Sequence, residues 1–307
     1  MARTELFVRK QSGGMFSVVN ETLTTGSIFF VDSNTGTDAA GYGQNPDAPC
    51  ATIDYAIGLC TASKGDRIYV MPGHVETISA AAGVALDVVG VEIIGIGSGS
   101  DRPKINFTAT ASTLTVTAAN ATIRNILFTG GVDAVVSCIV VSAADFKLLD
   151  CEYRDVTGEC TLFLLTTAGA NRMEIAGLRH DGATGTGTAA SIAIVGGDRI
   201  SIHDCKFDGN FSVGVIDVRT TATTDLEVYN CNARTRNAAC IFLVDTITAS
   251  TGMIGPNINI RLLTDAANIT EAITGATFVY FLPINIVNAA GQVAMLDNKT
   301  ASTDAIV

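Results

Sequence analysis

A short pattern that recurs along residues 91–261 restricts the folds open to this chain of 307 residues. Each copy reads apolar, variable, apolar, variable, then a turn residue, then another apolar residue. The turn residues of successive copies stand 30, 25, 27, 27, 26 and 27 residues apart; they are Gly95, Asn125, Asp150, Gly177, Asp204, Asn230 and Asn257. A period of this length, built from strand patterns, predicts stacked repeats.

The alternation within each copy predicts which side chains point inward. Ile200 and Ile202 fall on one face of a strand, whereas Ser201 and His203 fall on the other. One continuous inner file is expected to hold Ile123, Leu148, Ile175, Ile202 and Val228, and a file of larger residues to hold Phe128, Tyr153, His180, Phe207, Ala233 and Ile260. Two or three short strands in about 25 residues leave no room for a crossover helix, so parallel coils are favoured over βαβ units.

This recurrence resembles the right-handed parallel β-helix of the pectate-lyase-like superfamily, including phage-encoded structural members. The turn column of Asn and Asp is similar to that superfamily's asparagine ladder, and Gly65-Asp-Arg-Ile-Tyr-Val-Met-Pro-Gly73 resembles part of the entry module of many members. The resemblance covers roughly residues 27–290. It implies an all-β solenoid and no particular activity, because one fold carries many functions.

The predicted organisation has three parts: an N-terminal arm (1–26), the parallel β-helix (27–290, with repeats at 66–261 and terminal strands at 276–288) and a C-terminal tail (291–307). A helix is expected at 49–61, with Pro49 in its first turn and an apolar face formed by Ile53, Ala56, Ile57 and Cys60. This helix would cap the open end of the solenoid, which otherwise exposes strand edges.

The amino-acid composition indicates which kinds of binding partner are favoured. Charged residues make up 16% of the chain, against about 25% in an ordinary soluble domain, which indicates a surface partly covered by other subunits. The alternative is that stacked interiors simply require many Val, Ile and Ala. The sequence contains no run of about 18 apolar residues, so a membrane-spanning helix is not expected. The net charge of −11, without a cluster of basic residues, disfavours nucleic acid as a partner. The first residues lack the apolar core of a secretory signal.

Cysteines indicate no metal site, because the eight of them lack CxxC spacing. Cys205 and Cys231 are expected in neighbouring turns of the coil, about 4.8 Å apart, a distance that permits a disulfide. Free buried thiols are the favoured alternative for a chain made in a reducing cytosol.

The outward positions after each bend hold the candidate catalytic residues. Asp181 and Asp208 would form a carboxylate pair beside Arg154 and Arg234, as glycoside hydrolysis requires; a lyase would need a cation and a base. The other interpretation is a ladder in which Arg154 neutralises Asp181, Arg234 neutralises Asp208 and Glu152 pairs with its neighbour in the next turn.

A weak metal candidate is the loop Asp32-Ser-Asn34-Thr-Gly-Thr-Asp38, which partly matches a calcium loop but has Gly36 in place of an acid. A plain Asx-turn loop is the alternative. Among the histidines, His180 is expected in the core, His74 exposed, and His203 outward with Asp204 as its one carboxylate neighbour.

We therefore expect a non-enzymatic structural protein of a virus particle: a capsid decoration or fibre-type subunit, made in the host cytoplasm without a cofactor. It would assemble with itself, as a trimer by analogy with β-helical viral proteins, and with other virion proteins. Two alternatives stay open: a polysaccharide lyase or glycosidase of the tailspike type, and a glycan-binding adhesin. The absence of Trp disfavours the adhesin.

Overall fold

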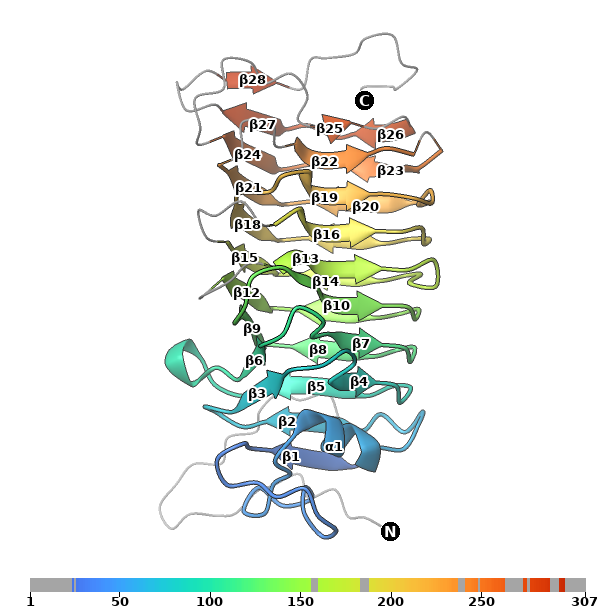
Figure 1. Ribbon diagram of the computed structural model, residues 1–307. Helices are drawn as coiled ribbons and strands as arrows, with labels where there is room; N and C mark the ends of the chain where they lie inside the picture. The colour runs from blue at the N-terminus through green and yellow to red at the C-terminus, as the bar shows by residue number, and fades with distance from the viewer. Residues whose placement is uncertain are drawn as a thin grey trace, which may run out of the picture.

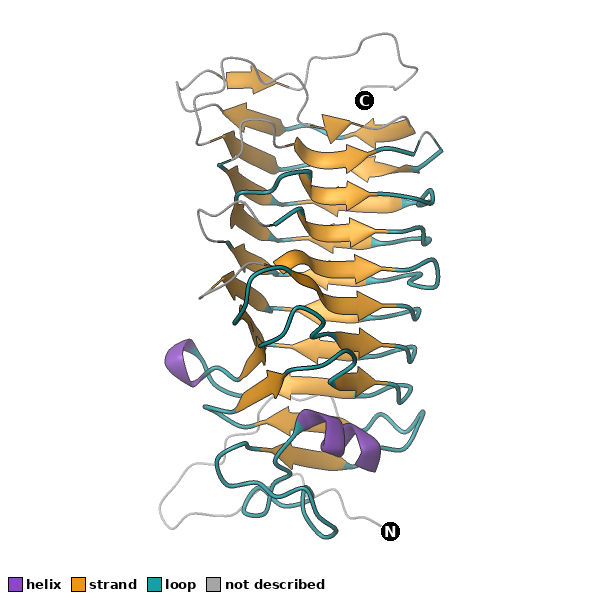
Figure 2. Ribbon diagram, viewed as in Figure 1, coloured by secondary structure: helices purple, strands orange, loops and turns teal. Residues whose placement is uncertain are grey.

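The fold is a right-handed parallel β-helix, seen here in a computed structural model (Figure 1). The structure describes residues 24, 26–155, 160–182, 188–236, 241–247, 249–262, 273–274, 277–287 and 293–295. Most of the predicted arm (1–26) and of the predicted tail (291–307) therefore lies outside the described residues. Three sheets run the length of the rod, and the chain visits them in the same order in each turn (Figure 2).

Sheet I contains ten parallel strands. They are β1 (Ile28–Val31), β2 (Arg67–Val70), β5 (Glu92–Gly95), β8 (Thr122–Arg124), β11 (Lys147–Leu149), β14 (Glu174–Ala176), β17 (Ser201–His203), β20 (Leu226–Tyr229), β23 (Thr251–Ile254) and β26 (Thr277–Tyr280).

Sheet II contains eight parallel strands. They are β4 (Val84–Leu86), β7 (Leu114–Val116), β10 (Val135–Val141), β13 (Cys160–Thr166), β16 (Ala190–Ile194), β19 (Gly214–Val218), β22 (Ile241–Asp245) and β25 (Ile273–Thr274).

Sheet III contains ten strands, of which the last pairs antiparallel with its neighbour. They are β3 (Val75–Ile78), β6 (Lys104–Phe107), β9 (Leu127–Gly130), β12 (Glu152–Asp155), β15 (Arg179–Asp181), β18 (Lys206–Gly209), β21 (Asn232–Thr235), β24 (Ile258–Leu262), β27 (Ile284–Val287) and β28 (Val293–Met295).

The interior is built from the files that the repeat predicts. Ile123, Leu148, Ile175, Ile202 and Val228 stand in direct register on successive strands of sheet I, and all five are fully buried. The file of larger residues on sheet III is also confirmed: its members pair in order and each is at most 2% exposed; they are Phe128, Tyr153, His180, Phe207, Ala233 and Ile260.

The bends between sheets I and III explain the Asn, Asp and Gly column. Six of the predicted turn residues have a left-handed backbone, with φ between 52° and 67°; they are Asn125, Asp150, Gly177, Asp204, Asn230 and Asn257. Glycine, Asn and Asp tolerate this conformation better than other residues. Some of the amides also connect neighbouring turns: Asn257 Nδ2 donates to Asn230 Oδ1 at 3.0 Å. The left-handed backbone is therefore common to these six bends, and hydrogen bonds between turns are added where the residue is Asn.

The capping helix is shorter than the predicted 49–61. Helix α1 spans Ile53–Leu59, with Thr52 as its N-cap accepting a hydrogen bond from the Tyr55 amide. Pro49 does not open the helix, because its carbonyl and the adjacent Cys50 pair with the loop after β1 and with β1 itself. Ile53, Ala56 and Ile57 are buried against the first strands. A second helical segment, η1 (Gly99–Asp101), precedes β6. Neither is long and apolar enough to cross a membrane.

The cysteines of the described residues are free thiols. Cys151, Cys205 and Cys231 lie buried just after the bend, in one column as predicted. Burial raises the pKa of Cys151 to about 12, and it also raises the pKa of Cys205. These residues therefore act as small apolar side chains rather than as thiolates at neutral pH.

Removing a buried side chain from the inner file should destabilise the whole stack. Ile202→Ala is expected to lower the free energy of unfolding by about 2–5 kcal/mol, because it leaves a cavity between two packed neighbours. The control is Ser201→Ala on the outer side of the same strand, which should change it by less than about 0.5 kcal/mol. Chemical denaturation followed by circular dichroism measures both. Equal losses in the two variants would contradict the observed orientation of β17.

Candidate functional site

The candidate catalytic residues lie together on the outer face of sheet III. Arg154, Asp181, Asp208 and Arg234 occupy consecutive strands in direct register, β12, β15, β18 and β21. The two carboxylates are thus neighbours, as predicted from the repeat. Half-buried to exposed side chains form this file, so solvent reaches it.

Asp208 is engaged by two arginines. Arg234 Nη1 lies 3.1 Å from Asp208 Oδ2, and Arg236 Nη1 contacts Asp208 Oδ1. The predicted Asp208–Arg234 pair is therefore present, and Arg236 is an additional partner that follows β21. Each carboxylate oxygen of Asp208 therefore contacts a guanidinium, and the two arginines neutralise its charge.

Asp181 and Arg154 do not form the predicted ion pair with each other. Asp181 is held by Arg179 of its own strand, with Arg179 Nη2 at 2.9 Å from Asp181 Oδ2. Arg154 pairs instead with Glu152 of its own strand, with Arg154 Nη2 at 2.5 Å from Glu152 Oε1. Side chains two residues apart lie on the same face of a strand, and here this local partner replaces the partner in the next turn.

Glu152 is more enclosed than an outward position suggests, at 8% exposed. Arg102, from the segment after η1, reaches across to place Nη1 3.1 Å from Glu152 Oε2, and its other nitrogen donates to the Asp150 carbonyl. Sequence reasoning missed Arg102, because it lies about 50 residues from its partners and outside the repeat. This contact covers the carboxylate from the side of the first turns.

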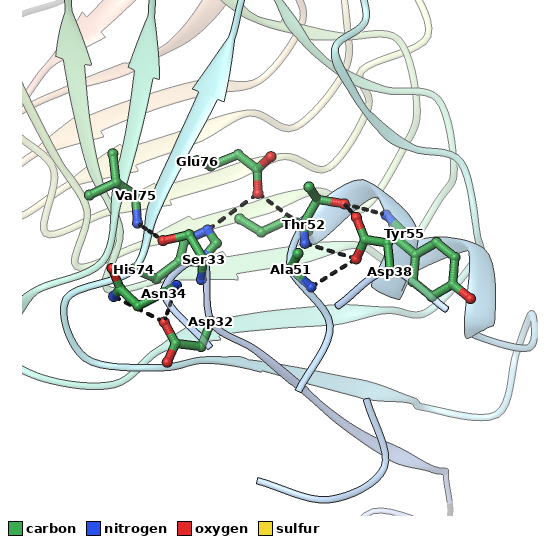
Figure 3. A network of polar contacts seen from close by, with 11 residues as sticks. Asp32, Ser33, Asn34, Asp38, Ala51, Thr52, Tyr55, His74, Val75 and Glu76 are labelled. Atoms are coloured by element: carbon green, nitrogen blue, oxygen red, sulfur yellow. Dashed lines mark hydrogen bonds and ion pairs between the residues drawn. The ribbon is translucent and has the colours of Figure 1, made fainter. Parts of the chain in front are cut away.

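The carboxylates proposed as metal ligands, Asp32 and Asp38, accept hydrogen bonds from groups of the same chain. Asp32 Oδ1 accepts from the backbone and side-chain nitrogens of Asn34 at 2.9 and 3.1 Å. Asp38 accepts from the amides of Ala51 and Thr52 and from the Thr52 hydroxyl, at 2.7–3.1 Å. Figure 3 shows Asp32 and Asp38 directed at these separate partners. The oxygens therefore stabilise an Asx turn and the start of α1.

The pKa of Asp32 reflects the same contacts. Burial alone would raise the pKa of this carboxyl, but hydrogen bonds from Asn34 and Thr35 outweigh burial and leave the pKa below its usual value. Within the described part of the chain, no group of three or more His, Cys, Asp and Glu side chains is arranged to hold a metal ion.

A buried polar network joins this loop to the first turn, and here one prediction is wrong: His74 is fully buried rather than exposed. The Ser33 amide donates to His74 Nδ1 at 2.9 Å, so His74 Nε2 carries the proton toward Glu76 Oε2 at 3.2 Å. The same Glu76 oxygen accepts from the Ile53 amide at 2.8 Å (Figure 3). A carboxylate at the first amides of a helix is favoured.

The position of Glu76 was detectable in the sequence. Its register partner is Ile105, which continues into Phe128 and the inner file of large residues. Glu76 thus stands where the alternation requires an inward side chain, and its burial at 7% agrees. A carboxylate at such a position needs buried donors, which here are His74 and the start of α1.

The remaining histidines differ in role. His180 is 1% exposed, and burial lowers its pKa to about 3; its Nδ1 lies 2.9 Å from Ser191 Oγ. The predicted core position is therefore confirmed. His203 lies outward as expected, but it has a second carboxylate partner besides Asp204, namely Glu174 at 3.5 Å, and its ring stacks on Tyr229.

Comparisons with known proteins give a likeness of fold. No protein-family model matches the chain, and no curated protein sequence matches it. A solved structure described as rhamnogalacturonan lyase superposes with a TM-score of 0.51 at 13% sequence identity, covering 91% of this chain and 86% of that one. This likeness confirms the parallel β-helix fold predicted from the repeat.

The buried imidazole should make stability depend on pH. Because the pKa of His180 falls to about 3 in the folded protein, against about 6.5 when unfolded, the unfolded chain binds one more proton between these values. This residue therefore removes up to about 1.4 kcal/mol of stability per pH unit as pH falls below 6.5. His180→Phe should flatten that slope in denaturation experiments at pH 7, 5.5 and 4. All other titrating groups are common to both proteins, so parallel pH profiles would refute the assignment.

Loss of the Glu76 carboxylate should weaken the capped end. Glu76→Ala leaves the Ile53 amide and the His74 ring nitrogen buried without an acceptor, which costs about 1–3 kcal/mol. Glu92→Ala is the control, because its partner Arg67 forms a more exposed pair of the kind worth about 0–1 kcal/mol. Urea denaturation measures the difference. A loss no larger in Glu76→Ala than in the control would argue against the network.

Proposed function

We propose that this chain is a non-enzymatic structural protein of a virus particle, a capsid decoration or fibre-type subunit that assembles with copies of itself, as a trimer by analogy. It would be made in the host cytoplasm and bind other virion proteins. The observation that carries the proposal is the pairing of the carboxylates on the outer face of sheet III. Asp208, Asp181 and Glu152 are each engaged by arginines of the same chain, and this pairing favours a stabilising role over a catalytic one.

The architecture supports the same proposal. Three long sheets around one continuous core make a rigid rod, and rigid rods suit fibres and surface projections. The chain also has few charges for its length, 16%, which fits a surface that is partly covered in an assembly. The virion setting itself rests on these features and on the resemblance of the repeat, both of which are associational.

Glycan cleavage is the second candidate function, and two observations favour it. The chain superposes on a structure described as rhamnogalacturonan lyase over 91% of its length. Asp181 and Asp208 also occupy neighbouring strands on an accessible face, and a pair of carboxylates is what glycosidases use. For such chemistry Asp208 would act beside Arg234 and Arg236, which would compete with the substrate for its oxygens.

A glycan panel tests the two functions. We expect the purified protein to release neither reducing ends nor unsaturated products from acidic or neutral polysaccharides, because its carboxylates are already paired. Cleavage that disappears in Asp181→Asn/Asp208→Asn, with an unchanged circular dichroism spectrum, would establish the enzymatic alternative. The matched control is Asp145→Asn, which removes a carboxylate paired with Arg172 away from sheet III.

Two other results would also be decisive. Cleavage that persists in the double variant would place an active site elsewhere and would equally reject the non-enzymatic proposal. Mass spectrometry of purified particles made from the genome that encodes this chain tests the virion setting. The protein should copurify with the particles in a fixed ratio to the shell protein, and its absence from them would reject that setting.

A further inference from the structure

The outer face of sheet III collects positive charge in a chain that is acidic overall. Between β12 and β24 this face carries six cationic side chains; they are Arg154, Arg179, Lys206, Arg234, Arg236 and Arg261. The same stretch carries three carboxylates, those of Glu152, Asp181 and Asp208. We call these nine side chains the cationic strip. Six cations less three carboxylates give it a net charge of +3, so the rest of a chain with a net charge of −11 carries −14.

The fold assembles the cationic strip from residues that are far apart in the sequence. Five successive strands of sheet III contribute at least one cation each (Figure 1). From Arg154 to Arg261 these cations stand 25 to 28 residues apart. The sequence therefore contains no run of basic residues, although the folded protein presents one along the rod. Carboxylates at the edges of the strip, Asp150, Asp155 and Asp204, are offset in part by Arg102 and Lys104 at its lower end.

The order of the charges is not the one that stability alone would favour. Like charges stand in direct register at three places in the strip; they are Arg179 with Lys206, Asp181 with Asp208, and Arg234 with Arg261. Like charges directly opposite one another destabilise a sheet. Within the part of the chain that the structure describes, Lys206 and Arg261 form no ion pair. The carboxylates are thus paired, while an excess of positive charge is left over.

This excess charge is accessible to a partner. The side chains of Arg154, Arg179 and Arg234 are 48%, 59% and 54% exposed, and Lys206 and Arg261 are exposed as well. Each of the three arginines reaches its carboxylate through one nitrogen. Because a guanidinium carries five N–H donors, each arginine has further donors that an incoming anion can use.

We propose that the cationic strip binds an acidic segment of another protein, a short stretch rich in Asp and Glu. Its carboxylates would meet Lys206, Arg261 and the outward donors of the arginines, which is the electrostatic complementarity that steers partners together. Five strands about 4.8 Å apart place the first and last cations about 19 Å from each other. About six extended residues span that distance. This inference specifies a contact with other proteins and rests on the proposed function for the partner being a protein.

Two observations favour an acidic protein segment over other anionic polymers. The outer positions of strands β3 to β27 in sheet III hold no aromatic side chain, whereas sugar rings and unstacked bases pack on aromatic faces. A long polyanion would also extend beyond the strip and meet the remaining charge of −14, which repels it. A short acidic segment on a folded partner can contact the strip alone.

Fluorescence anisotropy with a labelled peptide of six glutamates tests the inference. The wild-type protein should bind this hexaglutamate at low salt and should not bind hexaglutamine. Raising the salt from about 10 mM to about 150 mM shortens the Debye length from about 30 Å to about 8 Å, so binding should weaken. Lys206→Glu/Arg261→Glu reverses the two cations that lack an ion pair and should raise the Kd at least about tenfold.

The matched control is Arg124→Glu/Lys64→Glu, which reverses two exposed cations outside the strip. It changes the net charge of the chain by the same amount and should change the Kd less than about twofold, because distant charges are screened. Unchanged circular dichroism shows that both double variants are folded.

Carbodiimide cross-linking of hexaglutamate to the wild-type protein gives a test that needs no variant. The reagent joins a glutamate carboxylate to a lysine amine as an amide, and it takes up the water lost and becomes a urea. Peptide mass spectrometry should find the main cross-link at Lys206. Lys64 and Lys147, exposed lysines outside the strip, serve as internal references.

Four results would overturn the inference. One is no binding of hexaglutamate at low salt with a Kd below about 1 mM. Another is an equal loss of affinity in the two double variants, and a third is cross-linking mainly at Lys64 or Lys147. The fourth is tighter binding of a thymidine hexanucleotide or a sulfated hexasaccharide than of hexaglutamate, which would assign the strip to another class of partner. Glycan cleavage would reject the non-enzymatic function and would leave the hexaglutamate result as it stands.

Discussion

Backbone hydrogen bonding between successive turns is the constraint on which this structure depends. The described strands of sheets I and II pair only with the strands one turn above and one turn below, in a parallel arrangement. A slip of one residue between turns would exchange the inner and outer side chains of a strand. The left-handed residues at the bends between sheets I and III help to fix the register, because six of these bends fall on a Gly, Asn or Asp. The continuous inner file from Ile123 to Val228 results from this register between successive strands.

The ends of the stack pose a different problem, because a terminal turn has no further turn to cover it. At the first turns the inner file of large residues stops at Glu76 rather than at another apolar residue. The carboxylate there binds the start of α1 and the buried His74. A polar end to an apolar file lets the cap attach through directed hydrogen bonds, and those bonds hold the helix in one position over the core.

The sequence was sufficient for the parts of the fold that repeat. The periodicity predicted the inner files, the bends and the neighbours of Asp208. The same position recurs in every turn, so each inward or outward assignment is supported by several copies of the repeat. It failed at the start of the rod and for some side-chain pairs within the repeat. The helix start was misplaced because Pro49 is a good first residue of a helix but here pairs with the loop after β1. His74 follows a glycine turn, where alternation gives no inward or outward assignment. Arg154 pairs with Glu152 rather than with Asp181. The difference lies in the side-chain rotamer of Arg154, which the spacing of residues in the sequence does not determine.

The outer face of sheet II shows why strict alternation also failed within the stack. Two adjacent residues of a strand, such as Val215 and Ile216, both enter the core, so a period of two loses its phase in the middle of the strand. The resulting outer positions fall on Val, Leu and Ala, which a reader of the sequence assigns to the interior. Low overall charge thus has two origins in this chain: a long core, and one outer side built from core-like residues.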